Sequence, residues 1–141
     1  MGFELKVSGG PGTIELGFET ITSVRYFTDT PDDSNARSND VSLAVEIKGK
    51  IITALDGDKD DTVNLAKWSV IPVEDPNCYG QVTVRYISAG MVVREMKLPN
   101  AFIVYYKESF DNETGVGYFE TLIRQKKDKN KVFECSGSFG A

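Results

Sequence analysis

The stretch 101-AFIVYYKESFDNETGVGYFETLIRQ-125 contains two segments that favour β-strands, separated by a polar turn. Residues 101–110 and 117–125 are rich in Val, Ile, Tyr and Phe, and they show the period-two alternation of strands with one buried face. Between them, residues 111–117 carry Asn and Gly, which tolerate the backbone conformations of a tight reversal. The stretch therefore predicts a β-hairpin.

The same alternation recurs along most of the chain, separated by short turns at 8–12 (SGGPG), 88–90 (SAG) and 98–100 (LPN). These turns carry the Gly, Pro or Asn that a chain reversal favours. The further predicted strands are 3–7, 13–18, 21–27, 41–51, 81–87, 92–98 and 131–137. The sequence predicts a mainly β protein.

One segment, residues 60–69, departs from this pattern and predicts a helix. Asp60 and Asp61 stand at its start, where acidic residues complement the helix dipole, and Pro72 follows its end. We expect Leu65 and Trp68 to pack this helix against the sheet. Nine strands and one helix without βαβ alternation indicate a single domain, residues 1–141, built as a β-barrel or a two-sheet sandwich with one flanking helix.

Composition narrows the classes of function. The chain has 16 basic and 21 acidic side chains, a net charge of -5, so its overall charge disfavours nucleic acid. It has no histidine, which excludes imidazole-based triads and most zinc sites. No apolar run approaches the roughly 18 residues of a membrane span. The N-terminal residues lack a secretory pattern, so we expect a cytoplasmic protein without membrane contact, and reduced thiols at Cys78 and Cys135.

The segment 56-DGDKDDTVNLAK-67 begins like a calcium loop, with Asp56, Asp58 and Asp60 at alternate positions. It then departs from that pattern, because Asp61 stands where the loop needs glycine and Lys67 where it needs a bidentate carboxylate. We interpret it as the acidic start of the helix, and we expect neither a metal nor a cofactor.

Three carboxylates in the hairpin raise the alternative of a hydrolase. Glycoside cleavage uses two carboxylates across a cleft, commonly with aromatic rings for the sugar. The residues concerned are Glu108, Asp111 and Glu113, with Tyr105, Tyr106 and Tyr118 nearby. A solvated acidic turn explains them better, since nothing in the sequence raises the pKa of one carboxyl. We therefore predict no catalytic residues and no enzyme.

The run 99-PNAFIVYYKESFDNETGVGYFETLIRQKKDK-129, with its LPNAF and YKESFD patterns, resembles the C-terminal region of type VI secretion tube proteins, the hemolysin-coregulated protein (Hcp) family. The order of the preceding segments is also similar: early strands, a long polar loop, the strand 41–51, then one helix. Bacteriophage tail-tube proteins and the inner tubes of other contractile injection systems share this architecture. The resemblance extends over about two thirds of the chain.

The resemblance implies a β-barrel subunit that joins five others in a ring, and rings that stack into a hollow tube inside a contractile sheath. The partners it implies are further copies of the chain, the sheath, the baseplate and spike proteins, and cargo in the lumen. Nucleic acid enters only if the tube is a phage tail that conducts DNA. Type VI, phage-like and extracellular apparatus all remain open. The implied localisation is assembly in the cytoplasm, with export or release as part of an injection particle without a signal peptide.

In that family a long loop after the early strands reaches an adjacent subunit or ring, and the equivalent here is 28-TDTPDDSNARSND-40. Its acidic residues outnumber its single Arg37, and Pro31 stiffens it. The inter-subunit residues we predict are Asp29, Thr30, Pro31, Asp32, Asp33, Ser34, Asn35, Arg37 and Asp40. The dense basic cluster that would receive them is Arg124, Lys126, Lys127, Lys129 and Lys131. The alternative is a monomeric ligand-binding barrel in which this loop is a lid, and a carboxylate hydrolase ranks third.

Overall fold

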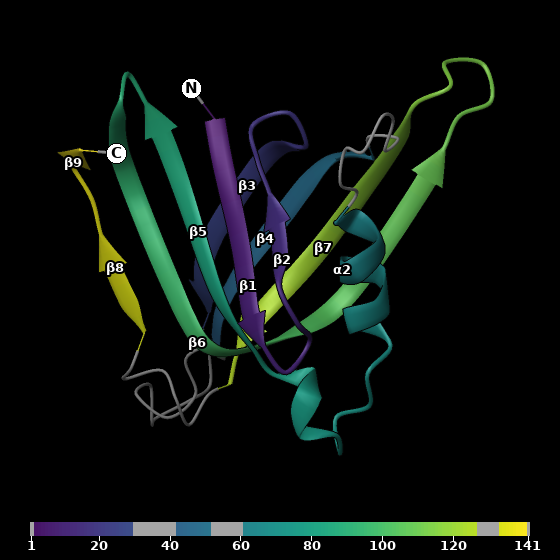
Figure 1. Ribbon diagram of the computed structural model, residues 1–141, viewed down its shortest axis with the longest axis horizontal. Helices are drawn as coiled ribbons and strands as arrows, with labels where there is room; N and C mark the ends of the chain where they lie inside the picture. Colours follow the sequence, from purple (N-terminus) through teal and green to yellow (C-terminus); the bar gives the residue numbers. More distant parts are fainter. Residues whose placement is uncertain (1, 30–41, 52–60, 127–132, 141) are drawn as a thin grey trace.

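The computed structural model describes residues 2–29, 42–51, 61–126 and 133–140, which form one antiparallel sheet and one α-helix (Figure 1). The elements are β1 (Gly2–Gly9), β2 (Ile14–Leu16), β3 (Ile21–Asp29), β4 (Ser42–Ile51), α2 (Thr62–Ser69), the 3-10 turn η1 (Pro76–Cys78), β5 (Gly80–Ser88), β6 (Met91–Phe110), β7 (Gly117–Gln125), β8 (Glu134–Ser136) and β9 (Phe139–Gly140). The predicted mainly β class with one helix is confirmed. None of the helical segments in these ranges has the length and apolar character to cross a membrane.

The sheet runs in the order β2-β1-β5-β6-β7-β4-β3, and β8 and β9 pair with the first half of β6. Ala101, in the middle of β6, pairs with Gly80 of β5 on one side and with Gln125 of β7 on the other. The strand therefore changes partners at this residue, from β5 before it to β7 after it. The two ends of the order, β2 and β3, are not paired with each other, so the predicted barrel is open rather than closed.

The predicted turn at 98–100 was wrong, because β6 runs through it as one strand of 20 residues. The pairing with β5 is irregular between Leu98 and Ala101. Pro99 lies in this irregular stretch, where its missing N–H costs no regular inter-strand hydrogen bond. The backbone of Asn100 bonds elsewhere: its carbonyl oxygen accepts the Lys126 N–H at 2.8 Å. Here the chain bends without reversing (Figure 1).

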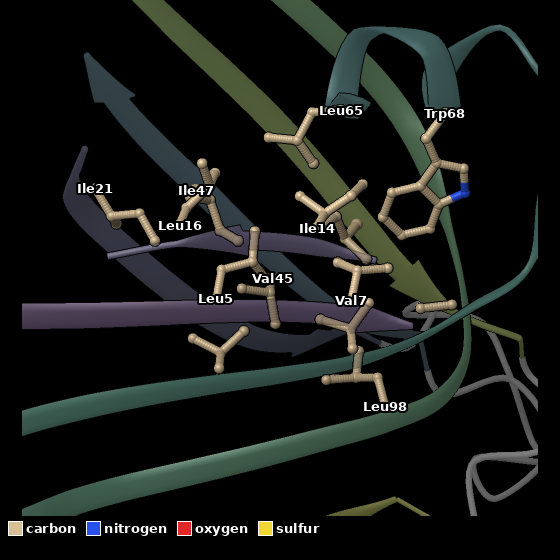
Figure 2. Packing of buried hydrophobic residues seen from close by; sticks show 14 of the residues in the cluster. Leu5, Val7, Ile14, Leu16, Ile21, Val45, Ile47, Leu65, Trp68 and Leu98 are labelled. Carbon is tan, nitrogen blue, oxygen red and sulfur yellow. The ribbon is translucent and has the colours of Figure 1, made fainter. Parts of the chain in front are cut away.

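This bend in β6 folds the sheet into two layers (Figure 1). One layer contains β1, β2, β5 and the first half of β6; the other contains β3, β4, β7 and the second half. Buried side chains from both layers form a single core. Figure 2 shows Leu5 and Val7 of β1 beside Val45 of β4, with Leu98 of β6 next to them.

The helix α2 is pinned to this core at both ends. At its start Asp61, only 1% exposed, accepts the Glu15 N–H of β2 at 2.7 Å and the Asn64 side-chain N–H at 3.1 Å. Near its end the Trp68 indole Nε1 donates to the Cys78 carbonyl oxygen at 2.7 Å. Leu65 and Trp68 are buried and point toward the sheet (Figure 2). The helix begins two residues later than predicted, and Asp60 lies outside the described residues.

The C-terminal segment is shorter and more divided than the predicted strand 131–137. It forms β8 against Lys97, Met96 and Glu95, and then β9 against Val92 and Met91. Residues 131 and 132 lie outside the described part of the chain.

Candidate assembly surface

The three carboxylates of the hydrolase alternative lie on the exposed end of the β6–β7 hairpin. Glu108 accepts the Tyr106 hydroxyl at 2.7 Å, and Asp111 accepts the backbone N–H of Glu113 at 2.9 Å. The second contact is the local side-chain bond that stabilises a turn. The observed geometry is that of a turn, and Glu108, Asp111 and Glu113 are all exposed.

Two long strand edges lack a partner among the described residues, in addition to the edge of the three-residue strand β2. β3 pairs with β4 on one side only, and the second half of β6, residues 102–110, pairs with β7 on one side only. We call these the β3 edge and the β6 edge. Each leaves a row of backbone N–H and C=O groups that another strand can bond, which is the feature that natural sheets cover or pair. They lie at opposite ends of the four-strand series β6-β7-β4-β3.

One face of this four-strand series is polar, and we call it the polar face. Residues directly opposite each other on neighbouring strands project to the same face of a sheet, so the register identifies the residues of this face. The polar face carries Arg25, Glu46, Lys48, Tyr105, Lys107 and Glu120, and Ala44, Tyr118 and Leu122 lie on the same side.

Glu46 pairs with a cation of the neighbouring strand, Arg25, and with a cation of its own strand, Lys48. Arg25 Nη2 lies 3.3 Å from Glu46 Oε2, and Lys48 Nζ lies 3.7 Å from Glu46 Oε1. The Tyr105 hydroxyl donates to Glu120 at 3.1 Å. Burial, followed by this bond to a carboxylate, raises the pKa of Tyr105 above its usual value. These ion pairs are largely exposed and contribute little to the free energy of unfolding. They make the face hydrophilic without stabilising the fold much.

The opposite face of the series lies toward the layer that contains β1, β2 and β5, and toward α2. Tyr106 on this face stacks on Phe119, with ring centroids 6.3 Å apart, and its hydroxyl lies 3.4 Å from the Thr62 carbonyl oxygen of the helix. One side of the series is thus covered by the first layer and α2, whereas no described element packs across the polar face.

Two hollows open at the β3 side of the molecule. The larger, about 460 Å³, lies between β3, β5, β6 and β8 and has mostly apolar walls, with Arg94 and Cys135 also on its lining. The smaller, about 360 Å³, lies at the start of β3; its lining is Gly2, Phe3, Phe18, Ile21, Thr22 and Tyr86.

The predicted arm and its basic docking cluster fall mostly outside the described residues. Of the arm, Thr28 and Asp29 belong to β3, so the strand extends two residues beyond the predicted 21–27, and residues 30–40 are not described. Of the cluster, only Arg124 and Lys126 are described. Arg124 lies on β7 with a buried Nε that finds no hydrogen-bond partner among the described residues, and Lys126 Nζ lies 5.2 Å from the Tyr79 ring centroid.

The sequence did not indicate the two unpaired edges or the hollow at the start of β3. Phe110 was assigned only to a strand, although it precedes an acidic turn, a position where a large apolar side chain has little of its own chain to pack against. That position was the one available signal. The edges themselves depend on which strands pair, and alternation does not encode pairing.

Solved structures with the same fold come from tube-forming secretion and injection systems. Hcp1 from Flavobacterium johnsoniae matches with a TM-score of 0.58 and 18% identity, over 100% of both chains. A chain of the sheath–tube complex of the PVC extracellular contractile injection system matches with a TM-score of 0.54 and 12% identity, over 96% of this chain and 88% of that one. Hcp1 from the E. coli EAEC 042 pathovar matches with a TM-score of 0.53 and 11% identity, over 97% and 99%. No family model matches the chain, and the search of curated proteins found no match.

These likenesses define the class of fold. The chain has the fold of Hcp and of contractile injection system tube proteins, and the likeness extends over its whole length. At identities of 11–18% these similarities establish the fold alone. A function has to be inferred from the surface described above.

Proposed function

We propose that this protein is a structural subunit that closes into a ring, with rings stacking into the hollow inner tube of a contractile injection system. The observation that carries the proposal is the pair of unpaired edges on an Hcp-like fold. Repeated head-to-tail contact between two different surfaces closes a ring when the rotation allows it. A β3 edge that pairs with the β6 edge of the next copy satisfies both rows of backbone groups and leaves no open edge in the series.

The strand directions permit this pairing. Successive strands in the series β6-β7-β4-β3 are antiparallel, so β6 and β3 run in opposite directions. In a ring every copy has the same orientation along the axis, so the β3 edge meets its neighbour's β6 edge in antiparallel pairing. The resulting wall is a continuous antiparallel sheet.

The distribution of bulk decides which face turns inward. A ring has more room outside its wall than inside. The layer of β1, β2 and β5, together with α2, lies on one side of the series only (Figure 1). That side faces outward, and the polar face with Glu46, Lys48 and Lys107 lines the channel. A channel with mixed, paired charges remains wet and does not bind an apolar cargo tightly.

The resemblance supplies the ring size, six, and the further partners. Neighbours in structure come from a baseplate of the anti-feeding prophage and from a PVC sheath–tube complex. We accordingly propose a sheath and a baseplate as partners of the assembled tube, and assembly in the cytoplasm.

Light scattering after size-exclusion chromatography, with negative-stain electron microscopy, tests the proposal. We expect a species of six times 15.6 kDa, or tubes of stacked rings with a central channel. A species that stays at 15.6 kDa over the accessible concentration range contradicts it. That outcome favours the second candidate, a monomeric ligand-binding protein, whose supporting observation is the apolar hollow of about 460 Å³ between β3 and β8.

A further inference from the structure

Phe110 is a large apolar side chain held in place on the surface. It is 70% exposed at the end of β6, opposite Gly117 of β7. Its ring covers this glycine: a Cβ added to Gly117 would lie 2.7 Å from Phe110 Cε1. The Phe110 ring is already packed on the glycine of the hairpin, so it loses little further conformational entropy on binding.

The face on which Phe110 lies is the covered face of the series. Phe110 and Tyr106 are four residues apart in an unbroken register, so both project to the same side. Tyr106 is half-buried against Phe119, whereas Phe110 continues the same row past the end of the core. The row of apolar side chains therefore ends uncovered at the hairpin.

The hollow at the start of β3 has aromatic walls on the same side of the sheet. Phe3 and Tyr86 are in ring contact with centroids 5.1 Å apart, and Phe18 lies over the backbone of Gly2 while 51% exposed. Ile21 and Thr22 of β3 complete the lining. A fourth aromatic ring would find edge and face contacts there, which favour aromatic clusters beyond simple burial.

The register places these two features at the same end of the four-strand series. Gly117 pairs with both Phe110 and Ile51, and Gly49 of the same strand β4 pairs with Ile21. The end of β6 and the start of β3 therefore lie at one end of the series. Antiparallel pairing of the two edges brings these ends together, so Phe110 lies toward the start of the next copy's β3.

We propose that Phe110 of one subunit seats in the aromatic hollow of the next, between Phe18 and Tyr86, and anchors the ring contact. The partner is a second copy of this chain, and the inference rests on the proposed ring. Interfaces concentrate their binding energy in a few buried aromatic anchors, and Phe110 is the exposed aromatic that the edge pairing aims at an apolar hollow.

Directed disulfide formation tests the contact. One population carries Cys135→Ser and Phe18→Cys, the other Cys135→Ser and Phe110→Cys; Cys78 stays, because it is buried and burial raises the pKa of its thiol. We expect mild oxidation of the mixture to give a disulfide between the two populations. The matched control replaces Phe110→Cys by Tyr118→Cys, which lies on the same hairpin but on the polar face, and should give little product.

Assembly of single variants supplies the second measurement. Phe110→Ala should raise the concentration for half-maximal ring formation by about tenfold or more, the loss of one anchor residue. The melting temperature of the single subunit should stay that of the unaltered protein, because the Phe110 side chain is exposed in the single subunit. Tyr118→Ala should assemble within about threefold of the unaltered protein, as substitutions outside an anchor do.

The outcomes separate this inference from the proposed function. Rings that form without the Phe18–Phe110 disulfide, or that tolerate Phe110→Ala, overturn the anchor and leave the tube subunit standing. An unaltered protein that never leaves the 15.6 kDa state overturns the tube subunit itself.

Discussion

Trp68 shows how one side chain joins the helix to the sheet. Its ring is 2% exposed in the core cluster, and its indole N–H is satisfied by the Cys78 carbonyl. A buried indole needs such a partner, since an unpaired N–H in the interior is costly. The side chain thus holds both α2 and the segment after it.

We expect Trp68→Ala to lower the free energy of unfolding by about 3–5 kcal/mol, because it leaves a cavity and an unpaired carbonyl. Chemical denaturation followed by circular dichroism measures the loss. Val63→Ala in the same helix is the control: Val63 is exposed, and its change should stay within about 0.5 kcal/mol. Equal effects of the two substitutions would remove Trp68 from the core.

At the scale of the element, β4 shows why a central strand contains a glycine. Gly49 lies between the β2–β3 turn and β7, and the neighbouring Lys50 N–H bonds the Thr20 carbonyl oxygen at 2.7 Å. A side chain at position 49 would collide with that carbonyl and with the Phe119 ring. The close approach holds the turn before β3, and with it one wall of the aromatic hollow.

Gly49→Ala should therefore destabilise the protein by about 1–3 kcal/mol, the usual cost of overpacking a filled site. Thermal unfolding provides the measurement. Gly17→Ala, in the same turn, is the matched control, since a Cβ there meets no atom within 4 Å. A Gly49→Ala variant as stable as Gly17→Ala would show that the turn moves freely.

At the scale of the whole molecule, the contacts proposed within a ring and those proposed between rings involve different parts of the chain. In the proposed tube, the two edges and Phe110 act between neighbours in a ring. The acidic stretch 28–40, as the resemblance implies, reaches an adjacent subunit or ring, and most of it lies outside the described residues. Ring closure and stacking should therefore be separable by substitution.

We expect deletion of residues 30–38 to leave a folded subunit that still closes into rings but does not stack into tubes. Lys126→Glu together with Lys127→Glu should weaken stacking in the same direction, with an effect that shrinks as salt screens the charges. Negative-stain microscopy distinguishes single rings from tubes, and circular dichroism checks the fold. Tubes of ordinary length from the deletion variant would refute the arm.

The sequence by itself determined the elements. Alternation identified β1 to β5, β7, β8 and the turn at 111–117, and it gave β6 as two strands, because one-sided burial imposes a period of two on each strand separately. The acids before Leu65 and the proline after Trp68 located α2 within two residues. These are local constraints, and they can be read from neighbouring residues.

Only the tertiary structure decided how the elements pair. Pro99 and Asn100 suggest a reversal, yet β6 continues because Asn100 bonds Lys126, a residue far along the chain. The open ends of the sheet, the polar face and the hollow beside Phe18 likewise depend on which strands lie side by side. Backbone hydrogen bonds are chemically alike at every residue, so pairing is chosen by the packing of the whole core, and the surface for assembly emerges only after that choice.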